Sequence, residues 1–345
     1  MATEAGKKRL QMADIARLAG VSVSTVSRAL AGNLAINAET RGRIVELARS
    51  LNYSINIGAQ NLRLQKNQTI AVVVPYDAKV RQHISDPFFL SLVGALADAL
   101  TDRGYDMLLS RVDADSLDSA AALVEGGKAI GLVVVGQWRH HDQLNALAAR
   151  RLPLVVWGGQ LARQLYCSVG GDNVMGGLLA TRHLLGLGRR RVLFAGDARL
   201  PEVDLRREGW RQALREAGIE PDPALELMVP FEAIGARARF DERMALGVDF
   251  DGLAACSDLM AVQAVQALRA AGHTVPGDVA VVGYDDMPIA TYTEPPLTSV
   301  HQPVLLAGEE LVEALLAQLR GEAVAPRTLP VHLVTRASAP AVAAA

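Results

Sequence analysis

The feature that most constrains the fold of this 345-residue chain is a regular alternation of two patterns from residue 69 onward. Short apolar runs predict strands at 69–75, 105–110, 130–136, 154–157, 191–196, 225–229, 252–256 and 279–283. Between them, apolar residues recur at helical spacing, at about 88–103, 116–126, 142–150, 173–187, 203–217, 233–246 and 258–272. Near-continuous apolar strands that alternate with helices predict parallel sheets buried on both faces.

These strand–helix units are numerous enough for an α/β core of two doubly wound parallel-sheet lobes over residues 67–345. The pattern breaks near 158–170, which predicts the boundary between the lobes. The first lobe is expected at about 67–160 plus 303–325, with a helix near 304–320. The second is expected at about 161–300 plus 327–336, with a closing strand near 328–335 and a disordered tail after Ala337.

Residues 1–52 predict a separate, all-α headpiece, and 53–66 have the weaker pattern of a linker. Three short helices are expected, at 12–19, 22–30 and 37–51. Gly20 stands at a sharp turn between the first two helices, and Ser22 can cap the second. This spacing predicts a helix-turn-helix whose second helix enters a DNA major groove, although an ordinary helical hairpin has a similar pattern.

The charge distribution supports a polyanionic partner at this end of the chain. Residues 1–66 hold ten Lys/Arg against four Asp/Glu, a net charge of +6. The whole chain has a net charge of -2, so the remainder carries about -8. A basic segment attached to an acidic body predicts that nucleic acid contacts only the headpiece.

The second predicted helix carries the candidate base-reading residues Val23, Ser24 and Arg28, which no core packing requires. Arg28 can donate two hydrogen bonds to a guanine edge, and Val23 can contact a thymine methyl group. Short polar side chains nearby suit phosphate oxygens, which fix register without reading sequence. These candidate backbone contacts are Ser22, Thr25, Ser27, Asn37 and Thr40.

A small-molecule pocket is expected at the carboxyl ends of the core strands, where doubly wound sheets bind ligands. The residues that follow those strands are Gln137, Trp138, Trp157, Ser257, Asp258 and Asp285, and Arg206 lies early in the helix after strand 191–196. Aromatic faces combined with charged groups suit a sugar ring and its hydroxyl pairs. The alternatives are structural: a turn cap for Asp285, and a core position for Trp157.

The sequence argues against an enzyme, a metal site and a bound cofactor. No glycine-rich dinucleotide motif follows the first strand, and the run Gly170–Gly177 is not followed by Lys-Ser/Thr, so tight packing is its expected role. No Ser or Cys stands in a nucleophile elbow. Cys167 and Cys256 lack metal-ligand spacing, and His140-His141 is expected in a solvated loop.

Beyond these features, the headpiece resembles the lactose/galactose-repressor family. The resemblance rests on residues 17–30 (RLAGVSVSTVSRAL), Thr40-Arg41 and Asn52-Tyr53, and it continues in order from about residue 12 to 336. It implies a hinge helix at 56–64 that lies in the minor groove. Asn56 would contact the DNA backbone, and Leu62 would open the central base step as a wedge. Ile55 departs from the family's proline, and an ordinary flexible linker is the alternative.

The resemblance also implies roles in the core. In the family, an arginine before a Gly-aromatic pair binds the effector, and Arg206 occupies that position here. The first aspartate of Gly-Tyr-Asp-Asp also binds the effector, and it corresponds to Asp285. Gln302 falls on a position that can line the pocket, although beside Pro303 it could simply start a helix. The Asp-Pro-Phe-Phe turn would place Phe88 and Phe89 at the cleft mouth. Two departures are Ser257, where many members have asparagine, and Gly158, where lactose-type members have aspartate.

Together these features predict a transcriptional regulator, and a repressor is the favoured type. It would bind a palindromic operator as a homodimer under the control of a mono- or disaccharide; a purine or other non-sugar metabolite is the alternative effector. A transporter's solute-binding protein shares the two-lobed, periplasmic-binding-protein-like core, but it would need an export signal and no basic headpiece. No run of eighteen apolar residues occurs, so a cytoplasmic, nucleoid-associated protein without a membrane span is expected.

Overall fold

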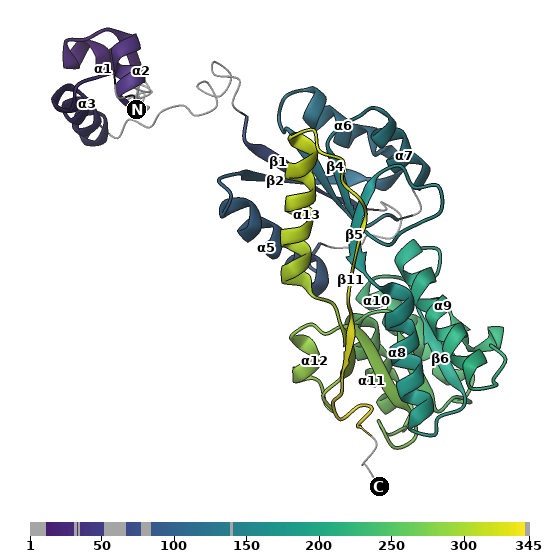
Figure 1. Ribbon diagram of the computed structural model, residues 1–345. Helices are drawn as coiled ribbons and strands as arrows, with labels where there is room; N and C mark the ends of the chain where they lie inside the picture. The colour runs from purple at the N-terminus through teal and green to yellow at the C-terminus, as the bar shows by residue number, and fades with distance from the viewer. Residues whose placement is uncertain are drawn as a thin grey trace, which may run out of the picture. The chain divides into compact units, whose positions relative to one another are not determined.

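The computed structural model describes residues 12–30, 33, 35–51, 67–76, 84–138 and 141–341. The chain divides into two compact units, Met1–Asn67 and Gln68–Ala345 (Figure 1). The smaller unit is helical where it is described, and the larger contains two six-stranded sheets. The predicted fold class, a helical headpiece followed by a core of two α/β lobes, is confirmed.

Three helices form the described part of the headpiece: α1 (Met12–Ala19), α2 (Val23–Leu30) and α3 (Ala38–Ser50). Gly20 connects α1 to α2 with a φ of +68°, a left-handed conformation that glycine adopts without steric cost. The inward side chains form one small apolar cluster, Ile15, Ala16, Val26, Ala29 and Ile44. Two of the five are alanines, so α1 and α2 can approach closely.

The first lobe of the core is built on a sheet in the order β11-β5-β4-β3-β1-β2, with every neighbouring pair parallel. Its strands are β1 (Thr69–Tyr76), β2 (Asp106–Asp113), β3 (Gly131–Val135), β4 (Leu154–Trp157), β5 (Cys167–Gly171) and β11 (Arg327–Leu329). Its helices are α5 (Pro87–Thr101), α6 (Asp118–Glu125), α7 (His141–Ala149) and α13 (Val304–Leu319), with a short 3-10 turn η1 (Ala114–Ser116).

Different helices cover the two faces of this sheet, because successive strand residues point to opposite sides. In β1, Ile70, Val72 and Val74 pack in the cluster that contains α5 and α13. Ala71 and Val73 pack in the cluster that contains α6 and α7. The strand is therefore buried on both faces, as its uninterrupted apolar sequence predicts.

The second lobe has a sheet in the order β12-β10-β9-β8-β6-β7, in which only β10 and β12 pair antiparallel. Its strands are β6 (Val192–Ala195), β7 (Glu226–Leu227), β8 (Gly252–Ala255), β9 (Ala280–Asp285), β10 (Thr298–His301) and β12 (His332–Val334). Its helices are α8 (Asn173–Gly186), α9 (Pro201–Glu216), α10 (Ala233–Ala245), α11 (Asp258–Ala270) and α12 (Ile289–Tyr292), with a 3-10 turn η2 (Pro223–Leu225).

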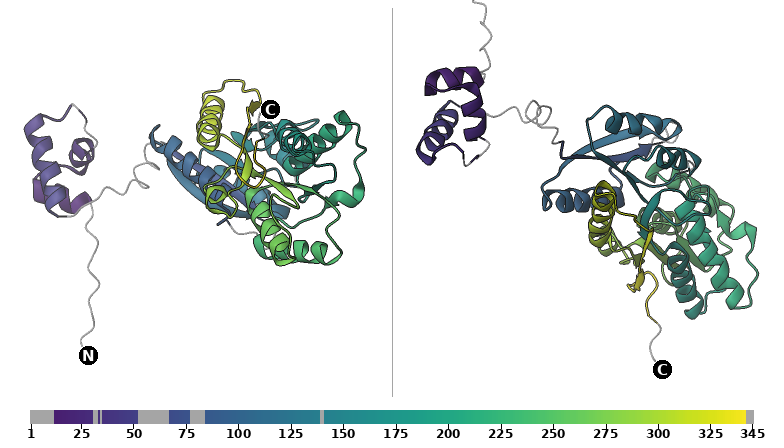
Figure 2. Two further views of the ribbon diagram at one scale, coloured as in Figure 1. Left: turned by 90° about the horizontal axis from the view of Figure 1, so that it is seen from below. Right: turned by 45° about the horizontal axis from the view of Figure 1, so that its top comes forward.

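The chain passes between the lobes three times (Figures 1 and 2): at Asp172 after β5, at Gln302–Pro303 after β10, and at 330–331 after β11. The backbone N–H of Asp172 donates to the carbonyl of Leu329 at 3.0 Å, which joins the first and third crossings. A Cβ on Gly171 would come within 2.8 Å of Gln302 Oε1 and 3.2 Å of Val331 Cγ1. Glycine at position 171 thus allows the three crossings to lie against one another.

The structure corrects the predicted lobe limits. Residues 167–171 and 327–329, assigned to the second lobe, form β5 and β11 of the first sheet. The segment CSVGG of β5 is short and glycine-rich, and β10 (TSVH) has little apolar character, so neither was predicted as a strand. Both strands exist because they pair with neighbours in a sheet, which the local sequence does not encode.

The predicted disorder after Ala337 is also wrong for the residues that directly follow it. The Ser338 side chain is fully buried, and its hydroxyl donates to the carbonyl of Val281 at 2.6 Å. The N–H of Ser338 donates to the carbonyl of Pro296 at 2.9 Å. Polar backbone and hydroxyl groups, rather than an apolar pattern, attach this segment to the second lobe.

Candidate functional site

The outer face of α2 carries the three predicted base-reading residues, Val23, Ser24 and Arg28. All three are exposed, and 42% of Val23 is accessible although it is apolar. Ser22 precedes the helix and caps it, because its hydroxyl accepts the N–H of Thr25 at 3.1 Å. An apolar, a hydroxyl and a guanidinium group therefore stand together on one solvent-facing helix surface.

The predicted phosphate contacts surround this face. Asn37 caps α3, where its amide oxygen accepts the N–H of Thr40 at 2.7 Å, so a phosphate would need its amide nitrogen. Thr25, Ser27 and Thr40 are partly exposed. Asn56, Leu62 and the predicted hinge helix lie outside the described residues.

In the core, a cavity of about 60 Å³ lies between the two lobes. Aromatic side chains form much of its wall: the ring centroids of Phe88 and Trp157 are 5.8 Å apart, and those of Phe89 and Phe231 are 6.4 Å apart. Asp86 caps α5 by accepting the N–H of Phe88 at 2.9 Å, which fixes the turn that presents both phenylalanines. The full lining is Phe88, Phe89, Gly136, Trp138, Trp157, Leu200, Glu202, Val203, Arg206, Phe231 and Asp285.

Arg206 projects from α9 into this cavity and is 7% exposed. Its Nε donates to Asn173 Oδ1 at 2.8 Å, and its Nη1 donates to the carbonyl of Cys256. The guanidinium carbon lies 3.7 Å from the centre of the Tyr284 ring, a cation–π contact in a desolvated site. Arg206 is therefore held in place before any ligand arrives.

Asp285, the last residue of β9, faces Arg206, with Oδ1 3.9 Å from Nη1. Gln302 Nε2 donates to the same Oδ1 at 2.7 Å. Burial raises the pKa of Asp285 well above its usual range, and the nearby Arg206 offsets part of that increase. A ligand hydroxyl pair between these side chains would meet a donor on one side and a carboxylate on the other.

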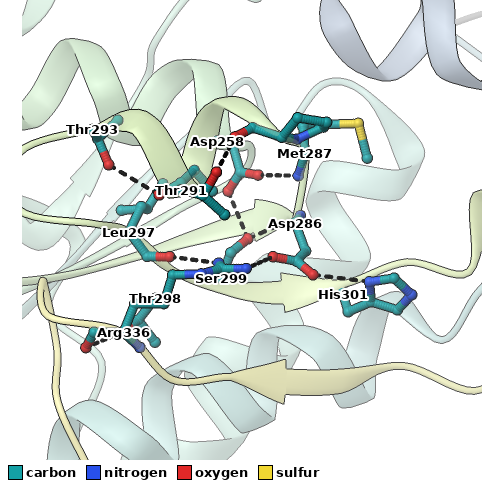
Figure 3. A network of polar contacts seen from close by, with 12 residues as sticks. Asp258, Asp286, Met287, Thr291, Thr293, Leu297, Thr298, Ser299, His301 and Arg336 are labelled. Carbon is teal, nitrogen blue, oxygen red and sulfur yellow. Dashed lines mark hydrogen bonds and ion pairs between the residues drawn. The ribbon is translucent and has the colours of Figure 1, made fainter.

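The turn that carries Asp285 has an unusual backbone, with φ of +104° at Asp285 and +55° at Asp286. Asp258 and Ser299 support it (Figure 3): Asp258 Oδ2 accepts the N–H of Met287 at 2.7 Å, and Ser299 Oγ accepts the N–H of Asp286 at 3.0 Å. The Ser299 hydroxyl in turn donates to Asp258 Oδ1 at 2.6 Å. Burial raises the pKa of Asp258 to about 7, although the hydrogen bonds that Asp258 accepts from Ser299 and Met287 act to lower it.

Six of the nine predicted pocket residues line the cavity: Phe88, Phe89, Trp138, Trp157, Arg206 and Asp285. The other three, Ser257, Gln302 and Gln137, are buried but are not among the residues that line it. Ser257 caps α11, accepting the N–H of Met260 at 3.3 Å. Gln302 contacts Asp285, and Gln137 donates from Nε2 to the carbonyl of Gly159 at 2.7 Å and to the Tyr166 hydroxyl at 3.0 Å. The side-chain nitrogens of both glutamines are engaged by protein groups, whereas Oε1 of Gln137 and Oε1 of Gln302 are buried without a hydrogen-bond partner among the described residues.

Gly158, the departure from the lactose-type pattern, is explained by Gln137. A Cβ on Gly158 would lie 2.5 Å from Gln137 Cδ, so the glutamine occupies the space of a side chain at 158. The Tyr166 hydroxyl that contacts Gln137 also lies 2.9 Å from His141 Nδ1. His141 begins α7 and is partly buried, which corrects its predicted place in a solvated loop.

Sequence reasoning missed Glu202 and Phe231, together with Gly136, Leu200 and Val203. Glu202 lies one helical turn before Arg206, so its i, i+4 spacing could have indicated the same helix face. Its Oε1 accepts the N–H of Gln137 at 3.1 Å, a hydrogen bond between the lobes, and burial raises its pKa. Phe231 precedes α10 in an irregular segment, where no periodic signal marks it.

Metal ligands and membrane-spanning helices can be assessed in the part of the chain that the structure describes. Within it, no group of three or more His, Cys, Asp and Glu side chains is arranged to hold a metal ion. None of the described helices is long and apolar enough to cross a membrane. The pocket itself combines aromatic walls with a buried Arg–Asp pair.

Comparisons with known proteins concern both the headpiece and the core. Residues 11–56 match "Bacterial regulatory proteins, lacI family", and 181–339 match "Periplasmic binding protein-like domain". The "HTH-type transcriptional regulator CelR" of Thermobifida fusca is 33% identical over 341 residues, 96% of this chain and 99% of that protein. A solved CelR–cellobiose complex has a TM-score of 0.72 at 32% identity, covering 96% of this chain and 100% of that one.

A second solved structure, the lac repressor dimer bound to operator and the anti-inducer ONPF, has a TM-score of 0.85 at 25% identity. It covers 97% of this chain and 100% of that chain. The helix-turn-helix, the two-lobed core and this similarity over nearly the full length lead to one conclusion. The chain belongs to the lacI family of DNA-binding bacterial transcriptional regulators.

Proposed function

We propose that this regulator is a repressor that binds a palindromic operator as a homodimer. Its affinity for the operator would fall or rise when a sugar occupies the core pocket. The observation that carries the effector part is the buried Arg206–Asp285 pair within an aromatic wall. As a transcriptional regulator of the lacI family, the protein is not an enzyme.

For the operator, we assign base reading to Arg28, with Val23 and Ser24 beside it on the exposed face of α2. The guanidinium would donate two hydrogen bonds to one guanine, a geometry that distinguishes base pairs in the major groove. Backbone contacts would come from Ser22, Thr25, Ser27, Asn37, Thr40 and Asn56. Leu62 would act as the minor-groove wedge at the centre of the palindrome.

A homodimer follows from the palindrome, since one headpiece would serve each half-site. Exposed apolar side chains in both lobes support such an interface: Leu90 on α5 is 52% exposed, Leu305 on α13 is 74% exposed, and Tyr292 on α12 is 85% exposed. Large apolar groups in such numbers on regular elements are typical of association surfaces. Because the operator would lie on the bacterial chromosome, we assign the protein to the cytoplasm.

For the effector, we assign a mono- or disaccharide. The rings of Phe88, Trp138 and Trp157 would stack on the apolar faces of a pyranose, while Arg206 and Asp285 would bind adjacent hydroxyls. The CelR relative was solved with cellobiose, a disaccharide. A negatively charged ligand such as a sugar phosphate is disfavoured, because Arg206 is the one cationic side chain among the described residues of the lining and is already engaged by Asn173, Cys256 and Asp285.

The pocket volume supports allosteric control. The cavity of about 60 Å³ is smaller than the roughly 150 Å³ that accommodates benzene, so a sugar requires the lobes to adjust. A ligand that binds one arrangement of the lobes better shifts the population toward it. A typical coupling of about 1–3 kcal/mol would change operator affinity roughly 5- to 150-fold.

The test uses purified full-length protein and sheared fragments of the genome that encodes it. Bound fragments are sequenced without ligand and with glucose, galactose, ribose, cellobiose, adenine and hypoxanthine in turn. We expect a palindrome with a central pyrimidine–purine step, whose enrichment changes with one sugar, and lower transcription from that promoter in vitro. A response to a purine alone would replace the sugar assignment, and no enriched site in any condition would overturn the operator assignment.

A further inference from the structure

Asp286 follows the pocket residue Asp285 directly but does not line the cavity. Its carboxylate lies between Arg336 and His301 (Figure 3). Asp286 Oδ1 accepts from Arg336 Nη2 at 2.7 Å, and Asp286 Oδ2 lies 3.0 Å from His301 Nδ1. Only 12% of the Asp286 side chain is exposed, so the ion pair with Arg336 is shielded from solvent. Two adjacent aspartates thus face two different parts of the molecule.

The two partners of Asp286 lie on strands that adjoin the crossings, or just beyond them. His301 is the last residue of β10, and the chain crosses to the first lobe directly after it, at Gln302–Pro303. Arg336 lies two residues beyond β12, the strand that enters the second lobe from the crossing at 330–331. The ring of His332, the first residue of β12, packs on that of His301 with centroids 4.7 Å apart.

The turn between the two aspartates is rigid. Positive φ values at two successive non-glycine residues are unfavourable and persist only where surrounding contacts hold them. Asp258 and Ser299 supply those contacts to the backbone N–H groups of Met287 and Asp286. A displacement of Asp285 is therefore passed to Asp286 instead of being absorbed by the turn.

We propose that Asp286 is a positioning residue that clamps the second and third crossings to the turn bearing Asp285, and so converts ligand contact at Asp285 into movement of one lobe against the other. The effector part of this inference rests on the proposed function. The clamp itself does not, because it consists of protein groups alone.

The clamp can be measured without any ligand. Spin labels are attached to Ser119→Cys on α6 and Glu242→Cys on α10, one exposed site in each lobe, in the full-length chain. The native Cys167 and Cys256 are 7% and 1% exposed, so labelling is selective for the introduced thiols. We expect Asp286→Asn and Arg336→Met to broaden or shift the interlobe distance distribution measured by pulsed electron spin resonance, and Arg336→Lys to restore much of it.

Asp241→Asn is the matched control, since Asp241 also pairs with an arginine, Arg237, but lies on α10 away from the crossings. Its distance distribution should equal that of the unsubstituted chain. Thermal unfolding of each variant separates a change in lobe geometry from a loss of folding. Equal distributions in the unsubstituted chain, Asp286→Asn and Arg336→Met, with all of them folded, would overturn the clamp.

A second arm uses cellobiose as the probe and compares operator dissociation constants with and without it. Asp286→Asn should bind cellobiose with nearly unchanged affinity, while the ratio of the two operator constants falls roughly 2- to 30-fold. An unchanged ratio would overturn the transmission role of Asp286. If the unsubstituted chain does not respond to cellobiose, cellobiose is not its effector, and the distance measurement still decides whether Asp286 acts as a clamp.

Discussion

Gly177 of α8 lies directly against the backbone of Arg206 in α9: a Cβ on Gly177 would come within 2.0 Å of the Arg206 carbonyl oxygen. The contact is reciprocated one turn along, where a Cβ on Gly209 would come within 2.0 Å of the Val174 carbonyl oxygen. The two helices therefore pack backbone to backbone. The position of the Arg206 guanidinium in the pocket therefore depends on glycine at 177 and 209, because a methyl group at either position would push the helices apart.

The first prediction is that Gly177→Ala moves α9 outward and weakens both the fold and the pocket. Overpacking of this kind costs about 1–3 kcal/mol, because a backbone oxygen cannot rotate away as a side chain can. Urea unfolding and cellobiose titration measure the two effects. Gly186→Ala, on the same helix with open space around it, should leave stability equal or slightly higher. Equal behaviour of the two variants would contradict the close-packing account.

The second prediction concerns Arg28. Arg28→Ala should relax base preference at one operator position, with a loss of about 1–3 kcal/mol for the preferred base. Selection from a randomised operator library measures this preference. Arg17→Ala is the control, since its side chain on α1 is 77% exposed and paired only locally with Asp14. If Arg28→Ala merely weakens binding to all sequences and lowers the salt dependence, Arg28 is a phosphate contact instead.

The third prediction is that Arg206→Lys abolishes the effector response and leaves operator binding intact. Lysine keeps the charge that compensates Asp285 but loses the planar fork and the stacking on Tyr284. Cellobiose affinity should fall at least about tenfold, as expected for the loss of a bidentate contact. Arg215→Lys, at an exposed arginine of α9 that pairs with Glu208, should respond normally. A normal response from Arg206→Lys would mean that the effector binds elsewhere.

The fourth prediction is a pH dependence of stability that depends on Asp258. Its pKa is about 7 in the folded chain and near 3.8 when unfolded, so between these values the folded state holds the extra proton. Stability is therefore highest below about pH 4 with respect to this group, and falls as the pH rises to about 7, by about 1–4 kcal/mol. Urea unfolding at pH 5 and pH 8 measures the difference.

Asp258→Asn should remove this component, because asparagine does not titrate, and should cost about 1–3 kcal/mol through the mismatched hydrogen bonds to Met287 and Ser299. Asp241→Asn again serves as the control. The same pH slope in Asp258→Asn and the unsubstituted chain would assign the titration to another group.

The headpiece was predictable because its determinants are local. Gly20, the cap at Ser22 and the apolar spacing of Ile15, Val26 and Ile44 all act within one or two helical turns. The run Gly170–Gly177 was likewise predicted to serve tight packing, and a Cβ on Gly170, Gly176 or Gly177 would approach a neighbour within 2.3 Å. Arg206 and Asp285 were found because parallel strands end at one edge of a sheet, whatever the details of the lobe.

The sequence by itself determined the alternation of most helices and strands, the helix-turn-helix, the two-lobed class and the charged pair of the pocket. Tertiary structure alone decided that β5 and β11 join the first sheet, that Glu202 and Phe231 complete the cavity, and that Ser338 is buried. Periodicity reflects only residues that are neighbours in the sequence, whereas these features depend on contacts between segments far apart in the chain, such as β5 with β11. Such contacts have no signature within either segment, because each is stable only when the other is in place.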